Sequence, residues 1–164
     1  MSIMRRSLIK MLEEFRIYWK HYIIQSLLAT LSVFIVLYFL SLQKAVIIAS
    51  IGATAFIVFT MPDNITAQAR NVIGGHLVGL FFGFVFSLFP QPALIFSLFI
   101  YSIAVGASIL TMVVTDTEHP PAAGTALGVV MTGISLDVLI AVVLSVVMLS
   151  LIHRFFKPYL RDLT

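Results

Sequence analysis

The sequence predicts an all-α membrane protein, a compact bundle of four to six membrane helices, and three observations lead to this class. Of the 164 residues, 60% are hydrophobic and only 10% are charged, whereas soluble domains carry roughly 25% charged residues. Several apolar runs approach the roughly 20 residues that a helix needs to cross a bilayer. The Lys and Arg residues gather near the two ends of the chain. Since the sequence holds no cysteine, disulfides and thiolate chemistry are excluded.

The chain divides into an amphipathic start, a membrane domain and a short tail. Residues 1–20 carry large apolar side chains at helical spacing with basic residues between them, which is typical of a helix lying in the membrane interface. A helix packed on another subunit is the alternative. Residues 21–156 are predicted to form the transmembrane domain, and residues 157–164 a cytoplasmic tail. We expect no cleavable signal peptide, because Glu13 and Glu14 interrupt any apolar core.

The apolar runs of the membrane domain predict six helices, at about residues 21–42, 45–61, 72–89, 93–115, 120–132 and 137–152. The second and fifth are short for a full crossing. Asn71 and Asp137 stand where caps of the third and last helices would lie. Because Lys and Arg flank the first and last helices, both termini are expected in the cytoplasm, at the inner or plasma membrane. Six crossings satisfy this rule, and so do four if the two short helices enter and return.

A weak internal similarity favours two inverted repeats of three helices each. Gly52-Ala53-Thr54-Ala55 and Gly124-Thr125-Ala126 nearly coincide when the chain is shifted by about 71 residues, and the same shift lays the third helix on the last. In transporters with this arrangement, corresponding short helices carry the binding site. Here these are the second and fifth helices. A chance match among small residues is the alternative.

A polar, helix-breaking segment from Asp116 to Ala126, which we call the breaker segment, interrupts the apolar second half of the chain. Proline is tolerated in the first turn of a helix, and the residue before it avoids helical geometry. We therefore expect His119 to be extended and Pro120 to start a short helix. The free N–H groups at that helix start are predicted to suit an anion. A loop at the membrane surface is the alternative.

Five glycines at helical spacing predict close packing between helices. Glycine lets two backbones approach, and such stripes mark helix contacts in membranes. The contact is expected either within the subunit or across a homo-oligomer. The third helix carries three of these residues and the fifth helix two: Gly75, Gly79, Gly83, Gly124 and Gly128.

Arg70 and two histidines are the main candidates for a substrate site. Arg70 would attract an anion at the start of the third helix, with an interfacial anchor as the alternative. His76 and His119 would hydrogen-bond a substrate or pass a proton, since histidine titrates near neutral pH. A plain helix–helix hydrogen bond is the alternative for each.

Other polar residues of the same segments complete the candidate site. The acids of the breaker segment would handle protons or cations, or pair with the arginine of the third helix; a solvated loop is the alternative for both. The threonines of the short helices would line a path symmetrically, although threonine in a membrane helix often bonds its own backbone. The additional candidates are Thr54, Asn71, Asp116, Glu118, Pro120 and Thr125.

The motifs of enzymes and cofactor sites are not recognisable in the sequence. The histidines and acids match no metal-ligand spacing, and no nucleophile–base pair or phosphate loop is evident. We therefore expect neither an enzyme nor a bound metal or cofactor. The basic residues cluster at the ends beside membrane segments, so nucleic acid is not an expected partner; the lipid bilayer is.

Two blocks of the sequence resemble a known family. Arg70-Asn71-Val72-Ile73-Gly74-Gly75-His76 and His119-Pro120-Pro121-Ala122-Ala123-Gly124-Thr125-Ala126 are similar to the HPP family of integral membrane proteins, over about residues 20–155. The resemblance implies four transmembrane helices around the His-Pro-Pro motif. It also implies nitrite as a substrate, because plant and cyanobacterial members are associated with nitrite transport.

These observations together predict a membrane transporter or channel for a small inorganic anion, with nitrite as the anion that the resemblance implies. One alternative is a cation or proton pathway through the acidic His-Pro-Pro segment. Another is a membrane subunit that transports nothing and binds a partner protein.

Overall fold

The computed structural model describes residues 3–39 and 45–163. In these ranges the chain forms six α-helices and two short 3-10 helices, with no strand. The elements in chain order are α1 (Ile3–Phe39), α2 (Ala45–Thr60), η2 (Ile65–Ala67), α3 (Ala69–Ser87), α4 (Leu94–Val114), α5 (Pro120–Thr132), α6 (Leu136–Phe156) and η3 (Lys157–Tyr159). The predicted all-α membrane bundle is confirmed.

Among the residues that the structure describes, three stretches are long and apolar enough to cross a membrane: α3, α4, and the C-terminal stretch made of α6 and η3. In contrast, α2 and α5 have 16 and 13 residues and are shorter than a full span. Pro62 follows soon after the end of α2, and Pro120 begins α5. The two short helices foreseen in the sequence are therefore present, with α5 bounded at the residues expected.

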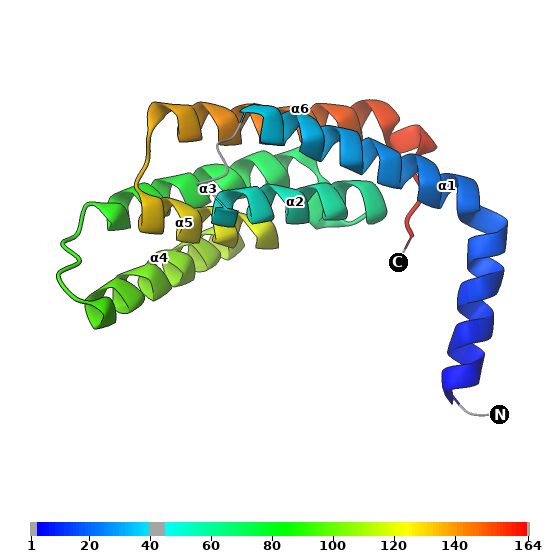
Figure 1. Ribbon diagram of the computed structural model, residues 1–164, viewed down its shortest axis with the longest axis horizontal. Helices are drawn as coiled ribbons and strands as arrows, with labels where there is room; N and C mark the ends of the chain where they lie inside the picture. Colours follow the sequence, from blue (N-terminus) through cyan, green and yellow to red (C-terminus); the bar gives the residue numbers. More distant parts are fainter. Residues whose placement is uncertain (1–2, 40–44, 164) are drawn as a thin grey trace.

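The six helices pack as two halves related by an approximate twofold axis. Helix α1 packs on α2 as α4 packs on α5, and α6 contacts α1 and α2 as α3 contacts α4 and α5. At the centre, α2 meets α5 and α3 meets α6. In Figure 1 successive helices run in alternating directions, so each helix of the first half is opposed to its counterpart in the second. This is the inverted arrangement of three-helix repeats expected from the sequence.

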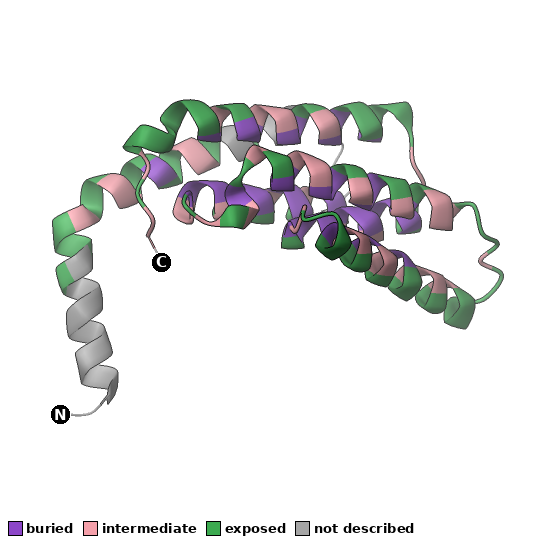
Figure 2. Ribbon diagram, turned by 180° about the vertical axis from the view of Figure 1, so that it is seen from behind, coloured by how far each residue is buried: buried purple, intermediate pink, exposed green. Residues whose placement is uncertain are grey.

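The core lies where the two short helices meet the inner faces of α3 and α6, as the purple segments of Figure 2 indicate. Its members are apolar side chains from α2, α3, α5 and α6, among them Ile47, Ile51, Val58, Phe59, Val72, Val129, Val142 and Leu149. Helix α4 is largely exposed and bears outward apolar residues such as Ile95 and Phe99, which suits a surface that faces lipid.

Helix α1 runs continuously from Ile3 to Phe39, so no break separates the expected interfacial segment from the first membrane helix. Its first part turns away from the long direction of the bundle in Figure 1. That geometry is compatible with an interfacial segment, which stays a prediction. The turn expected between the first two helices, at residues 41–44, falls on residues 40–44 and so lies outside the described residues.

Two predicted helix caps are wrong. Helix α3 starts at Ala69, with Gln68 at its N-cap, so Asn71 lies within the first turn. The Asn71 side-chain amide instead donates to the Glu118 carbonyl oxygen, between α4 and α5. Helix α6 is capped by Ser135, whose hydroxyl accepts from the Val138 N–H, and Asp137 lies within the first turn, two residues after the cap.

The glycine stripe of α3 packs against α5 within the subunit. A Cβ atom added at Gly79 would collide with the Ala122 carbonyl oxygen, and one at Gly83 would lie 2.7 Å from the Val129 Cβ. On the opposite side of α5, a Cβ at Gly128 would lie 3.2 Å from the Ile47 backbone nitrogen. The small residues therefore let α5 lie between α3 and α2 at backbone contact distance.

Candidate functional site

The His-Pro-Pro segment brings a histidine into the interior through its backbone geometry. Asp116 adopts a left-handed conformation, with φ 58°, just after α4 ends. His119 is then extended, with φ −143° and ψ 95°, and the two prolines occupy the first turn of α5. This is the conformation predicted for His119, and its side chain is 1% exposed.

Two buried histidines face each other across a threonine. Thr54 Oγ1 on α2 lies 2.9 Å from Nε2 of His76 on α3 and 2.9 Å from Nε2 of His119. The ring centroids of the histidines are 5.1 Å apart. On its other side, His119 Nδ1 donates to the Thr66 carbonyl oxygen at 2.8 Å. His76 and Thr54 are both 0% exposed, so this cluster is closed off from solvent.

The network continues from His76 to the crossing of the two short helices. His76 Nδ1 lies 2.8 Å from Thr125 Oγ1 on α5, which in turn lies 2.8 Å from Ser50 Oγ on α2. The Ser50 hydroxyl also reaches the Pro121 carbonyl oxygen. Hydrogen bonds therefore join Thr66, His119, Thr54, His76, Thr125 and Ser50 in one unbroken series, which we call the His–Thr network.

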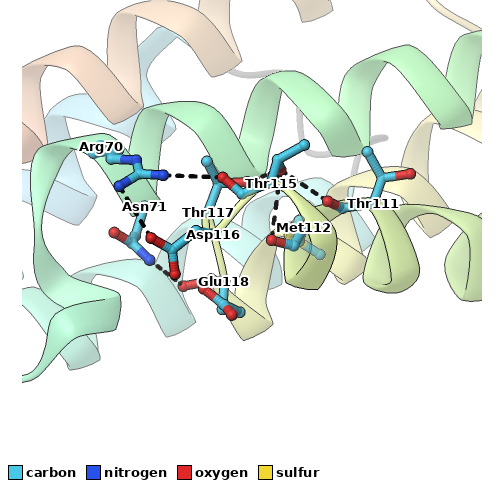
Figure 3. A network of polar contacts seen from close by, with 8 residues as sticks. All are labelled: Arg70, Asn71, Thr111, Met112, Thr115, Asp116, Thr117 and Glu118. Atoms are coloured by element: carbon cyan, nitrogen blue, oxygen red, sulfur yellow. Dashed lines mark hydrogen bonds and ion pairs between the residues drawn. The ribbon is translucent and has the colours of Figure 1, made fainter.

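A second polar group lies at the start of α3, next to the same breaker segment (Figure 3). Arg70 Nη1 lies 3.1 Å from Asp116 Oδ2, and Nη2 donates to the Thr115 carbonyl oxygen at 3.0 Å. The neighbouring Asn71 donates through Nδ2 to the Glu118 carbonyl oxygen at 3.1 Å. The Arg70 and Asp116 side chains are 62% and 66% exposed. This pair therefore holds the breaker segment against α3 from outside.

The candidates chosen from the sequence thus separate into two levels. His76, His119, Thr54 and Thr125 meet in the His–Thr network. Beside the network lies a second group, which we call the rim: Arg70, Asn71, Asp116 and Glu118. The ion pair with Asp116 was among the roles considered for Arg70. The Arg70 side chain contacts Asp116 and the Thr115 carbonyl and stays exposed.

One sequence-based expectation about α5 is wrong. Its start was expected to offer free N–H groups to an anion. Pro120 and Pro121 have no N–H, and the next N–H, that of Ala122, donates to the His119 carbonyl oxygen at 2.9 Å. The double proline that starts the helix therefore removes the donors that an anion would need. Pro120 sets the backbone and is itself exposed.

Ser50 belongs to the network although it was not among the candidate residues. It lies one helical turn before Thr54, and Thr54 Oγ1 is 3.0 Å from the Ser50 carbonyl oxygen. A polar pair at this spacing in an otherwise apolar helix was the available signal. The contact with α5 depends on Gly124, where an added Cβ would lie 3.3 Å from the Ser50 Cβ.

Comparison with known proteins identifies the family of the chain. The family model described as "HPP, transmembrane region" matches residues 14–160, nearly the whole chain. The chain belongs to the HPP family. It is also 36% identical over 96 residues to a transmembrane protein of Dictyostelium discoideum, an alignment that covers 56% of this chain and 32% of that relative. The chain therefore spans about a third of the curated relative it matches. No solved structure matches the chain.

The motifs that mark this HPP protein are the ones that build the network. The His-Pro-Pro motif supplies His119 and the bend into α5, while the Arg70–His76 block supplies the facing ring and the rim contacts. Among the described residues, the buried polar side chains include no Asp, Glu, Lys or Arg. The interior site is therefore neutral when both rings are neutral, and it offers hydroxyl and imidazole groups only.

Proposed function

We propose that this HPP protein is a transporter or channel for a small inorganic anion in the inner or plasma membrane, with the His–Thr network as its substrate site. Nitrite is the anion that the family resemblance implies. The observation that carries the proposal is the fully buried series of imidazoles and hydroxyls where the two short helices cross. Polar groups inside membrane bundles are costly and usually mark substrate or ion pathways.

The architecture supports transport. In transporters built from inverted repeats, substrates bind between the repeats, beside helices that do not span the membrane fully. Here the network joins α2 of one repeat to α5 of the other and takes its second ring from α3. The α4–α5 connection next to the network stops well short of the end reached by α2 and α6 in Figure 1. This places polar backbone at a depth where it has to line a path or be covered by protein.

The chemistry of the network favours an anion over a metal cation. Hydroxyl and imidazole N–H groups donate hydrogen bonds, which oxygen atoms of an oxyanion accept. A hard cation would need carboxylate or carbonyl oxygens. In the described residues the network holds no carboxylate, and Asp116 at the rim is already paired with Arg70. Asp116 is therefore better suited to holding the breaker segment than to conducting cations, and the contact of Glu118 with Asn71 uses its backbone carbonyl.

Transport by purified protein in liposomes tests the proposal. Uptake of nitrite, nitrate, chloride and formate would be followed against liposomes without protein. A flux of one or more of these anions that saturates with concentration is expected. Flux of cations alone would instead support the cation pathway, and no flux of any ion would support a subunit that only binds a partner.

A further inference from the structure

We propose that His76 and His119 form a single proton site, in which one proton is shared between the two rings through the Thr54 hydroxyl. If the proposed anion transport holds, this proton would accompany the anion through the protein. The donors and acceptors of the His–Thr network can be assigned in order, starting at the Thr66 carbonyl oxygen, which can only accept.

The direction of every hydrogen bond in the neutral network follows from the Thr66 carbonyl. A carbonyl only accepts, so His119 Nδ1 carries the hydrogen and Nε2 of the neutral ring is an acceptor. Thr54 must then donate to His119, and its oxygen accepts from His76 Nε2–H. The two neutral rings therefore hold opposite tautomers, Nδ1–H in His119 and Nε2–H in His76.

The hydrogen-bond directions continue through His76 to the Ser50 end of the network. With hydrogen on Nε2, His76 Nδ1 accepts from the Thr125 hydroxyl, and Thr125 accepts from Ser50. Each hydroxyl then donates to the next member of the series. The neighbouring Ser50 and Pro121 carbonyls stay unused by hydroxyls, and as helix carbonyls they bond to backbone N–H groups four residues on.

Those two unused carbonyls let the network accept a proton. If a proton binds Nδ1 of His76, Thr125 turns to donate to Ser50, and Ser50 donates to the Pro121 carbonyl. If it binds Nε2 of His119 instead, Thr54 turns to donate to the Ser50 carbonyl, 3.0 Å away. In transfer from His76 to His119, the Nε2 hydrogen of His76 passes to the Thr54 oxygen while the Thr54 hydrogen passes to His119 Nε2, which leaves neutral His76 with its hydrogen on Nδ1. Either ring can thus carry the charge without loss of a hydrogen bond, because a hydroxyl rotates to suit its neighbours.

The site holds one proton and not two, because the rings are close and buried. Their centroids are 5.1 Å apart, and two cations at that distance repel strongly where water is excluded. No described residue of α2, α4 or α5 carries a charge that would offset the second proton. The breaker segment and the start of α3 contribute Arg70, Asp116 and Glu118. Helix α6 contributes Asp137 and Arg154 near its ends, and its His153 is bonded to the Pro62 carbonyl.

A shared proton would give the otherwise neutral interior the positive charge that an anionic substrate needs. A lone anion in a site without fixed charge loses its hydration and gains no counter-charge. A protonated ring pair supplies that charge and an additional N–H donor. The anion and the proton would then cross the bundle as a neutral pair.

Nuclear magnetic resonance of ¹⁵N-labelled histidine tests the proton site without any substrate. Ring nitrogen shifts distinguish the two tautomers and the cation, and single substitutions of the four histidines assign the signals. At neutral pH, His119 is expected as Nδ1–H and His76 as Nε2–H. On acidification the pair should take up one proton while the protein stays folded. Equal tautomers in the two rings, or two protons bound together, would overturn the proposal.

Substitutions at Thr54 test the bridge. In Thr54→Val, Nε2 of His76 loses its acceptor, while the route through Thr125 and Ser50 still accepts a hydrogen. His76 should therefore switch to the Nδ1–H tautomer, whereas Thr54→Ser should keep Nε2–H. An unchanged His76 tautomer in folded Thr54→Val would show that Thr54 does not bridge the rings, and would overturn the proposal.

A flux measurement separates this inference from the proposed function. Liposomes that contain a pH-sensitive dye would report proton entry during uptake of whichever anion of the panel is carried. About one proton per anion is expected, with at least about a tenfold loss of this coupling in Thr54→Val. Anion uptake without acidification would overturn the coupling. The predicted tautomers with no anion flux would instead support the proton site and overturn anion transport.

Discussion

The hydroxyl of Ser50 reaches the carbonyl of Pro121, and these two residues are 71 positions apart in the chain. This is the shift that superimposes the two halves of the sequence, so Ser50 and Pro121 are equivalent positions. Equivalent positions touch only where the twofold axis passes between them. The contact therefore marks the axis of the inverted repeat at the crossing of α2 and α5.

The polar site lies on one side of that axis. The same shift places Val147 opposite His76 and Ile48 opposite His119, so the corresponding region of the other half is apolar. The approximate symmetry of the backbone thus supports an asymmetric site. The rim residues Arg70 and Asp116 lie beside the two histidines, which makes that side the expected approach for a polar substrate.

Loss of the Ser50 hydroxyl should weaken the crossing of the short helices. Ser50→Ala removes the contact with Thr125 and is expected to lower the free energy of unfolding by about 1 kcal/mol. Ser145 is a matched control, because it is also buried but bonds only the Ala141 carbonyl of its own helix. Thermal unfolding in detergent would compare the two variants. Equal effects would argue against a structural role for the crossing.

A methyl group on the glycine stripe should separate α3 from α5. Gly79→Ala is expected to lower the free energy of unfolding by about 1–3 kcal/mol, because its Cβ meets the Ala122 carbonyl oxygen. Gly106→Ala is the control, since a Cβ there has no neighbouring atom within 4 Å. The melting temperatures of the two purified variants give the comparison. A Gly79→Ala protein as stable as Gly106→Ala would rule out close packing at this position.

Neutralising Arg70 should reduce anion uptake moderately. The side chain is 62% exposed, and exposed ion pairs contribute only about 0.2–1 kcal/mol. Arg70→Gln should therefore fold normally and lower the rate a few-fold, with a smaller effect at high salt. Exchanging the pair, Arg70→Asp with Asp116→Arg, should recover stability better than either single change. A rate that is unaffected by Arg70→Gln at low salt would leave Arg70 as an interfacial anchor.

The alternating helix directions predict that both termini face the same side of the membrane. The bundle part of α1 begins at the end of the molecule where α6 finishes in Figure 1. The excess of Lys and Arg near both ends favours the cytoplasmic side. Reporter fusions near Met1 and at Thr164 would locate each terminus. Termini on opposite sides are incompatible with an even number of crossings.

Local sequence rules predicted the elements whose signals are strong and near in the chain. The pair Pro120-Pro121 defined the start of α5, because proline cannot lie deeper in a helix, and glycine spacing located the contact of α3 with its neighbour. The two halves were also predicted, from the match of a few small residues when the sequence is shifted against itself. The pairing of Arg70 with Asp116 was one of the roles considered for Asp116.

Features that depend on contacts between distant parts of the chain could not be predicted from local sequence rules. Asn71 is not a cap because its amide bonds the Glu118 carbonyl, which local rules do not include. Ser50 joined the site only because the fold brings α5 against it. The prediction of an anion at the start of α5 failed because proline defines the helix and also removes its first donors.

The most direct test of the account compares anion uptake by two histidine variants in liposomes. His119→Gln removes a ring of the His–Thr network, whereas His153→Gln replaces a buried ring that bonds only the Pro62 carbonyl. We predict that folded His119→Gln loses uptake by about tenfold or more, since an interaction in a buried site with a charged partner contributes roughly 1.5–3 kcal/mol. His153→Gln should keep most of its rate. Folded His119→Gln that carries the anion at the unmodified rate would contradict the assignment of the network as the transport site.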